Sequence, residues 1–324
     1  PNSPQMKKLF LLSIVFCLFI SCRKNKTDIV ATSSNQSKIY FQGSNNTGAY
    51  GWEEIFSMNE DGSDQKQLTN FSKSGALAIF TGEPVLSPDG TKIFFNSHKD
   101  FLGGEIFSMN LDGSGVTKII INSFAGSSIQ SPFIYQNGQK IVFTHELDSF
   151  ANRHGEIFTA DINGNNEIAI TAFPDNCFDP CVDPANTTIV YSNLVGSRME
   201  LYAMNLNGTN KHALTTTGPA LKRHPQFSPD GTKIIFDAFI GVGADIFIIN
   251  ADGSNMTQLT NYTNSGAIDN YSWGATFSKD GKTIYFSSDE FNNRTSQLYK
   301  MNIDGSNKIK LTSSTEDKFN PCVK

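Results

Sequence analysis

The chain has 324 residues, of which 38% are apolar, 11% aromatic and 18% charged. This composition supports a folded core and excludes disorder for the bulk of the chain, because disordered chains combine few aromatics with high net charge. The net charge of −5 argues against a nucleic-acid-binding protein, which would carry a basic face, so we expect no nucleic-acid partner.

The N-terminus has the pattern of an export signal. A basic stretch at residues 6–8 precedes an apolar run over residues 9–20, which is the layout of a secretory signal peptide. The run is shorter than the ~20 residues that a membrane-spanning helix needs. We therefore predict a signal peptide in residues 1–21, with residues 1–5 upstream of the true start.

The signal ends at Ser21-Cys22, which resembles the bacterial lipobox, where a small residue precedes a cysteine that is acylated. The resemblance implies a lipid anchor at Cys22 and a polar tether over residues 22–37. It also implies an exported protein at the outer membrane or cell surface, facing the periplasm or the exterior. An ordinary signal peptide with a chance cysteine is the alternative.

The body of the chain repeats one segment six times. Residues 54–63 (EIFSMNEDGS) and 105–114 (EIFSMNLDGS) are nearly identical. Further copies begin at Glu156, Glu200, Asp245 and Gln297. Each copy alternates apolar and polar residues up to an Asp-Gly or Asn-Gly pair, which predicts a β-hairpin.

A second motif lies between these copies and predicts two more strands. Ser87-Pro88-Asp89-Gly90 leads into a run of apolar residues, and residues 228–236 and 278–286 repeat the pattern. Weaker copies occupy residues 136–143 and 183–191. Each repeat of about 50 residues therefore contains four strands, which is the size of one propeller blade.

The two ends of the repeat region complete each other. Residues 38–41 match the second strand of a repeat, and residues 319–323 match the first strand. Joined, they form one blade, and the pairing removes two open sheet edges. We therefore predict an all-β fold over residues 38–324: a six-bladed β-propeller of four-stranded antiparallel blades, closed by the C-terminal strand in the first blade.

The Ser-Pro-Asp-Gly and Asn-x-Asp-Gly-Ser turns resemble those of the TolB-like six-bladed β-propellers, which carry a WD40-like Pro-Asp-Gly repeat. The resemblance covers residues 38–324 and implies the fold, without fixing a function. WD40 proteins proper match less well because the Trp-Asp dipeptide is absent. The Ser-x-Asp-x-Gly-x-Thr-Trp box of sialidase propellers is absent as well.

Two sets of residues are candidates for a binding site. The residue before the proline of each inner strand is expected at the mouth of the central channel, where ionisable groups would meet a ligand; these residues are Glu83, Ser131, Asp179, His224 and Asn320, with Gly274 in the sixth blade. Alternatively they only cap strands. A metal site formed by Glu83, Asp179 and His224 is a further possibility.

The second set belongs to the long connections, which we expect on the face opposite the short turns. Binding residues concentrate on such loops, and the candidates are His98, His145, His154 and Trp273. The histidines could bind a metal or an anion; the alternative is that they are ordinary loop histidines. For the three cysteines of this region, Cys177, Cys181 and Cys322, free thiols are expected at the last two.

These features favour a binding protein over an enzyme. The sequence has no Gly-x-Ser-x-Gly elbow and no phosphate-binding loop. We expect a monomeric, lipid-anchored scaffold without a cofactor, which binds an envelope protein or a glycan through its long-loop face. The first alternative is a polysaccharide lyase or hydrolase with a metal at the channel mouth. The second is a Tol-system-like periplasmic component, although the N-terminal domain of such proteins has no counterpart before the first strand.

Overall fold

A computed structural model describes residues 37–45, 52–71, 79–99, 102–120, 127–149, 152–241, 243–261, 271–289 and 295–324. The predicted signal peptide, most of the tether and Cys22 lie outside these ranges. Within them, no helix is long and apolar enough to cross a membrane.

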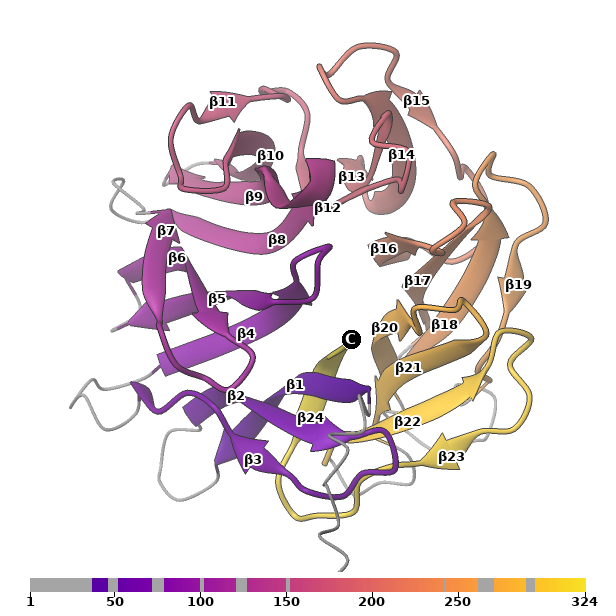
Figure 1. Ribbon diagram of the computed structural model, residues 1–324. Helices are drawn as coiled ribbons and strands as arrows, with labels where there is room; N and C mark the ends of the chain where they lie inside the picture. Colours follow the sequence, from indigo (N-terminus) through magenta and orange to yellow (C-terminus); the bar gives the residue numbers. More distant parts are fainter. Residues whose placement is uncertain are drawn as a thin grey trace, which may run out of the picture. The chain divides into compact units, whose positions relative to one another are not determined.

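The described residues form β-sheets whose strands follow one another outward from a central axis (Figure 1). The first sheet contains β24 (Lys318–Val323), β1 (Lys38–Asn45), β2 (Trp52–Asn59) and β3 (Lys66–Gln67). The second contains β4 (Ile79–Leu86), β5 (Lys92–Lys99), β6 (Leu102–Asn110) and β7 (Thr117–Ile120). The third contains β8 (Ser128–Tyr135), β9 (Lys140–Ser149), β10 (Asn152–Asp161) and β11 (Ile168–Ala169), with a 3-10 turn at Gln136–Gly138.

The next two sets of four strands are joined into one eight-stranded sheet. The first set contains β12 (Cys177–Val182), β13 (Thr188–Val195), β14 (Arg198–Asn205) and β15 (His212–Ala213). The second contains β16 (Leu221–Phe227), β17 (Lys233–Ile240), β18 (Gly243–Asn250) and β19 (Thr257–Gln258). A single parallel pair, Met199 with Leu221, joins β14 to β16. The last sheet contains β20 (Ser272–Phe277), β21 (Thr283–Ser288), β22 (Gln297–Asn302) and β23 (Ile309–Lys310).

The C-terminal strand pairs with the first strand of the fold. Antiparallel β24 lies beside β1, with Val323 opposite Ile39 and Cys322 opposite Tyr40. All-β propeller architecture with antiparallel four-stranded blades is therefore confirmed.

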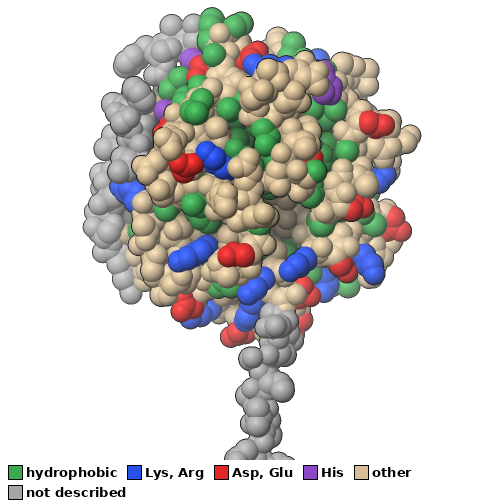
Figure 2. All heavy atoms as spheres, turned by 45° about the horizontal axis from the view of Figure 1, so that its top comes forward, with side chains coloured by type: hydrophobic (Ala, Val, Ile, Leu, Met, Phe, Trp, Pro, Cys, Tyr) green, Lys and Arg blue, Asp and Glu red, His purple; other side chains and the backbone are tan. Residues whose placement is uncertain are grey.

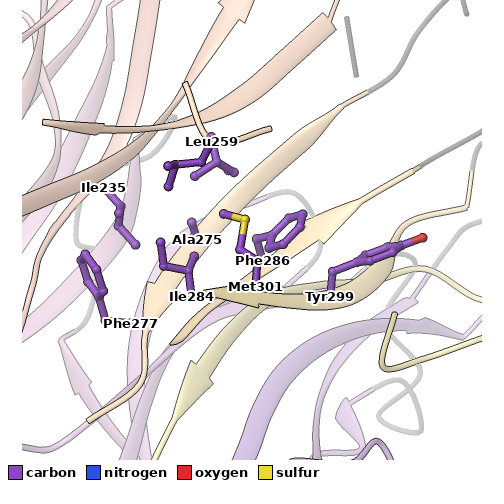
Figure 3. Packing of buried hydrophobic residues seen from close by; sticks show 9 residues of the cluster. Ile235, Leu259, Ala275, Phe277, Ile284, Phe286, Tyr299 and Met301 are labelled. Atoms are coloured by element: carbon purple, nitrogen blue, oxygen red, sulfur yellow. The ribbon is translucent and has the colours of Figure 1, made fainter. Parts of the chain in front are cut away.

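The core lies between neighbouring sheets because the strands bury alternate apolar residues against the next sheet. Figure 3 shows one such layer, in which Phe286 and Ile284 of β21 belong to one buried cluster with Ile235 of β17. All three side chains are fully buried, and each burial contributes roughly 1.5–3 kcal/mol. The phenylalanines concentrate in these layers; Phe236 and Phe247 stack at 5.6 Å, for example.

The short turns are stabilised by their own side chains. In the Ser-Pro-Asp-Gly turn, Ser87 Oγ donates to Asp89 and Gly90 N donates to Ser87 O. In the Asn-x-Asp-Gly-Ser turn, Gly62 has a φ of +85°, and a Cβ there would lie 2.1 Å from Leu311 O of the neighbouring blade. This contact explains the glycine of the repeat: it allows both the left-handed backbone and the close approach.

The face shown in Figure 2 carries Lys and Arg side chains interspersed with Asp and Glu.

Candidate functional site

The residues before the inner-strand prolines share an unusual backbone. Five non-glycine residues and one glycine adopt a left-handed φ between +50° and +61°; they are Glu83, Ser131, Asp179, His224, Gly274 and Asn320. At each of them the pairing of the inner strand with its neighbour is shifted by a bulge. A left-handed non-glycine residue costs of order 1–3 kcal/mol, so this conformation needs support from its surroundings.

The inner strands do not begin at the residue before their proline. The strands begin two to four residues earlier, as β12 does at Cys177 and β4 at Ile79. The bulge lets the strand continue through the proline, which cannot donate to a sheet ladder. The candidate residues therefore lie within the inner strands, which form the wall of the channel.

Hydrogen bonds between blades hold these six backbone amides. In each case the acceptor belongs to the preceding set of four strands along the chain. The pairs are Glu83 N to Gln42 Oε1 (3.2 Å), Ser131 N to Glu83 Oε2 (2.6 Å), Asp179 N to Thr144 Oγ1 (3.1 Å), His224 N to Asp179 Oδ2 (3.3 Å), Gly274 N to Asp237 Oδ1 (3.3 Å) and Asn320 N to Ser287 Oγ (3.1 Å). We call these six amides and their acceptors the amide ring.

The acceptors come from two kinds of position. Four of them occupy one equivalent place on the second strand of their blade: Gln42, Thr144, Asp237 and Ser287. In the other two cases the acid of the bulge itself, Glu83 or Asp179, bonds the next blade. This position on the second strand therefore contributes to the site, although the sequence indicated only residues of the first strand.

Two cations and two acids meet on one side of the channel. Arg223 Nε lies 3.4 Å from Asp179 Oδ2, and His224 Nδ1 lies 2.9 Å from Asp237 Oδ1. The acids are buried, with side chains 4% and 2% exposed, whereas Arg223 and His224 are 38% and 31% exposed. The two carboxylates are therefore more deeply buried than the guanidinium and the imidazole, and they orient these two cationic groups toward solvent.

The pKa values of this cluster follow from that arrangement. Burial would lower the pKa of His224, but the charges of Asp237 and Asp179 outweigh it and raise the value to about 9. Burial would raise the pKa of Asp179, but His224 and Arg223 hold it at about 2. Both groups are therefore charged at neutral pH. The pKa of Glu83 is raised by burial and by the nearby Asp179.

The bulge residues surround a cavity of about 90 Å3. All five predicted channel residues and Gly274 line it, together with the prolines that follow the five. A single water molecule needs at least ~10–15 Å3, so the cavity has room for part of a small polar ligand. Phe133, Cys181 and Gln226 also line a wider opening at the short-turn end, so the two spaces adjoin each other at these residues.

The structure places the three candidate histidines of the long-loop face in strands. His98 lies in β5, His145 in β9 and His154 in β10. His145 is only 3% exposed, because β9 continues past the apolar run that we took as its end. The expectation that His154 lies in a long loop was wrong, whereas His98 and His145, expected at or just after the end of the second strand, lie within β5 and β9 before these strands end.

These histidines also have separate partners. His98 Nε2 lies 3.4 Å from Ser128 Oγ, and His154 Nε2 lies 3.2 Å from Glu156 Oε1. His145 Nε2 is 3.2 Å from Ser127 Oγ. In the described part of the chain, no three His, Cys, Asp or Glu side chains are grouped to hold a metal ion. The histidines therefore do not form one site with His224.

The three cysteines of the propeller are free and buried. Burial raises the pKa of the Cys177 and Cys181 thiols to about 12. The expectation of free thiols at Cys181 and Cys322 is confirmed, and Cys177 shares that state.

Trp273 belongs to a row of aromatic side chains at the long-loop end of β20. Its ring lies 6.2 Å from that of Tyr271, and Tyr271 lies 6.0 Å from Phe239 of β17. All three are half-buried. Four of the residues described above were not predicted from the sequence: Tyr271, Phe239, Arg223 and Asp237. Asp237 occupies the same position on the second strand of its blade as Gln42 does.

Comparison with known proteins agrees with this geometry. A family model described as the TolB beta propeller domain matches residues 31–222 and 216–324, which is most of the chain. No curated protein matches the chain.

Solved structures show the same architecture. TolB from Acinetobacter baumannii aligns over 89% of this chain and 66% of its own, with a TM-score of 0.71 and 19% identity; the chain thus spans just under two thirds of that protein. A putative TolB from Agrobacterium tumefaciens aligns over 89% and 97%, with a TM-score of 0.62 and 16% identity. An oligogalacturonate lyase in complex with manganese aligns over 80% and 70%, with a TM-score of 0.54 and 14% identity. At these identities the likeness is one of fold.

Proposed function

This chain belongs to the TolB β-propeller domain family, and on that premise we propose that it is a non-enzymatic binding module of the cell envelope. Its site is the long-loop end of the central channel, where a protein segment or a glycan of the envelope would bind. The observation that carries the proposal is the amide ring: five strained non-glycine residues converge on one cavity and are fixed there by neighbouring blades. Strain of this kind clusters at binding sites, where it preorganises the groups that meet a ligand.

We further infer that the propeller has six blades. The eight-stranded sheet divides at its single parallel pair into two sets of four strands, and each set supplies one member of the amide ring. The pairing of β24 with β1 supports closure of the ring by the C-terminal strand.

The proposed location rests on the sequence of the N-terminus. The signal pattern and Cys22 support an exported lipoprotein held at the outer membrane or cell surface. A role beside the Tol system is an extension of the same proposal, supported by the fold alone.

The lyase alternative has less support. A metal held by channel histidines would need them near one point, whereas His98, His145 and His154 bond serines or an acid of their own surroundings. Of the four histidines considered, only His224 lines the cavity.

Photo-crosslinking tests the proposed site in the full-length protein within intact envelopes. A photoreactive phenylalanine analogue replaces Gln226, which lines both parts of the channel. The matched control carries the analogue at Ile309, which is 42% exposed on the outer strand β23. We expect a defined adduct from position 226 that is weaker in a Glu83→Gln background. Equal adducts at both positions, or none at position 226 in a folded protein, would contradict the proposal.

A further inference from the structure

The junction of β16, β17 and β20 carries a second pattern beyond the amide ring. Asp237 Oδ1 bonds both His224 Nδ1 of β16 and Gly274 N of β20, so one carboxylate fixes both inner strands. Trp273 directly precedes Gly274, and Arg223 directly precedes His224. An aromatic and a cation thus occupy equivalent positions on neighbouring inner strands, toward the long-loop end.

The two cations have bonding capacity left for a ligand. Among the described contacts, Arg223 bonds Asp179 through Nε, which leaves the two terminal nitrogens of the guanidinium for another acceptor. His224 uses Nδ1 for Asp237, and its Nε2 lies 3.9 Å from Asp179, beyond hydrogen-bond distance. The acids behind them already accept several hydrogen bonds. A planar carboxylate of a ligand matches the fork of an arginine, with the imidazole alongside.

The aromatic row gives the site an apolar side. Phe239 and Asp237 are two residues apart on β17 and therefore lie on one face of the strand. Phe239 contacts Tyr271 edge to face, and Tyr271 contacts Trp273 in the same way. Half-buried rings of this kind offer flat apolar faces, and the C–H faces of a sugar ring pack against such surfaces.

The remaining wall suits hydroxyl groups. Ser131, Gln226 and Asn320 line the cavity with neutral polar groups. The Ser131 hydroxyl donates to Asp179 and the Asn320 amide to Gln42, and the oxygens of both side chains remain able to accept from a ligand. An extended peptide would more readily add to a free strand edge, and the free edges here belong to the outer strands, far from the channel wall (Figure 1). The chemistry therefore favours a polyhydroxylated ligand.

We propose that this junction binds an acidic saccharide, with its carboxylate on Arg223 and His224 and a sugar ring against Trp273. The proposal rests on the proposed function and names the ligand class for that site. The bond is non-covalent, and no step of catalysis is implied.

Tryptophan fluorescence tests the proposal directly, because the chain has only two tryptophans. The Trp52→Phe variant of the full chain leaves Trp273 as the sole reporter. The probes are cellobiouronic acid and cellobiose, which share their rings and differ in one carboxylate. We expect the acid to change the Trp273 emission and to bind at least tenfold more tightly than the neutral sugar.

Three arginine variants distinguish binding at this site from a general effect of charge. Arg223→Gln should remove the preference for the acid, so that cellobiouronic acid and cellobiose bind with similar affinity. Arg198→Gln is the matched control, because Arg198 is also 38% exposed and also bonds an acid, Glu200, but lies on β14; it should change neither affinity. Arg223→Lys keeps the charge without the fork and should recover only part of the preference.

The outcomes distinguish this inference from the proposed function. Equal affinities for the two sugars, or a preference that survives Arg223→Gln in a folded protein, overturn the acidic saccharide. A short acidic peptide that binds more tightly than the acid sugar overturns it as well. In either case an adduct at position 226 would still support a binding site in the channel. Absence of that adduct would contradict both the proposed function and the acidic saccharide.

Discussion

His224 Nδ1 lies 2.9 Å from Asp237 Oδ1, and the same oxygen accepts the backbone N–H of Gly274 on the next inner strand. One buried carboxylate thus orients a charged side chain of the channel and also supports a left-handed residue of the neighbouring blade. Binding and ring stability are therefore coupled at this point, and changes here should affect both.

The charge of His224 predicts a pH dependence of stability. Its pKa in the folded protein, about 9, lies above the ordinary value of 6.5, so protonation stabilises the fold. This stabilisation is complete below about pH 6.5 and is lost as the pH rises through 9. We expect the denaturant midpoint to fall between pH 7 and 9.5, and His224→Gln should abolish most of that fall.

His98→Gln is the control for this prediction. Burial lowers the pKa of His98, so His98 affects stability only as the pH falls below the unfolded value. The loss of stability above pH 7 should therefore persist in His98→Gln. If His224→Gln shows the same alkaline loss as the wild type, the ion pair with Asp237 does not stabilise the fold.

Asp179 should be the most sensitive member of the amide ring. It accepts from Ser131 Oγ and from His224 N, and it faces the Arg223 guanidinium. Breaking a fully buried pair costs about 3–5 kcal/mol; because Arg223 is partly exposed, we expect about 2 kcal/mol for Asp179→Asn. The measurement is chemical unfolding at pH 7.

Ser192→Ala provides the comparison for Asp179. Ser192 Oγ reaches the same carboxylate at 3.5 Å, at the limit of a hydrogen bond. We expect a loss below about 1 kcal/mol. Equal losses of unfolding free energy in Asp179→Asn and Ser192→Ala would mean that the burial of this site stabilises the fold and that the charge of Asp179 does not.

Sequence reasoning succeeded where structure depends on neighbours along the chain. Alternating residues around Glu54 and the Ser87-Pro88-Asp89-Gly90 turn predict hairpins, because strand period and turn chemistry are local. It failed at His145, since a strand that continues beyond its apolar run does so through contacts with other strands.

The candidate site also combines residues that local sequence identifies with partners that only the packing of strands brings together. The x-Pro step marks Asp179 and His224, because proline cannot donate to the sheet ladder and is accommodated at a bulge. Nothing local marks Arg223 or Asp237 as their partners. Those pairs form between strands whose relative position is set only when the blades pack.

Removal of the C-terminal strand tests ring closure. Deleting residues 318–324 leaves β1 paired only with β2 and exposes the buried Tyr40 and Ile39 on its inner side. We expect loss of cooperative thermal unfolding by circular dichroism. Deleting Lys324 alone, which removes one backbone bond to Lys38 O, should lower the midpoint only slightly. An unchanged midpoint in the longer deletion would show that the ring closes without β24.

Cys22 carries the prediction about location. Cys22→Ala should move the protein from the membrane fraction to the soluble fraction, because acylation needs the thiol and a short signal cannot anchor the mature chain. Fractionation followed by immunoblotting measures this. Cys181→Ala is the control and should remain with the membrane, since that thiol is buried in the propeller. Membrane retention of Cys22→Ala would contradict the anchor.

Gly274 tests how closely the inner strands approach. Its φ is +61°, and a Cβ would lie 2.5 Å from Asn320 Oδ1 of β24. Gly196 has nearly the same φ, +64°, but a Cβ there meets nothing within 4 Å. Gly196→Ala should therefore cost only the left-handed backbone, roughly 1–2 kcal/mol. Gly274→Ala should cost more and should also weaken ligand binding in the channel, because Asn320 must move. Equal losses of stability in the two variants would show that Asn320 yields freely and that the ring is not tightly closed at this junction.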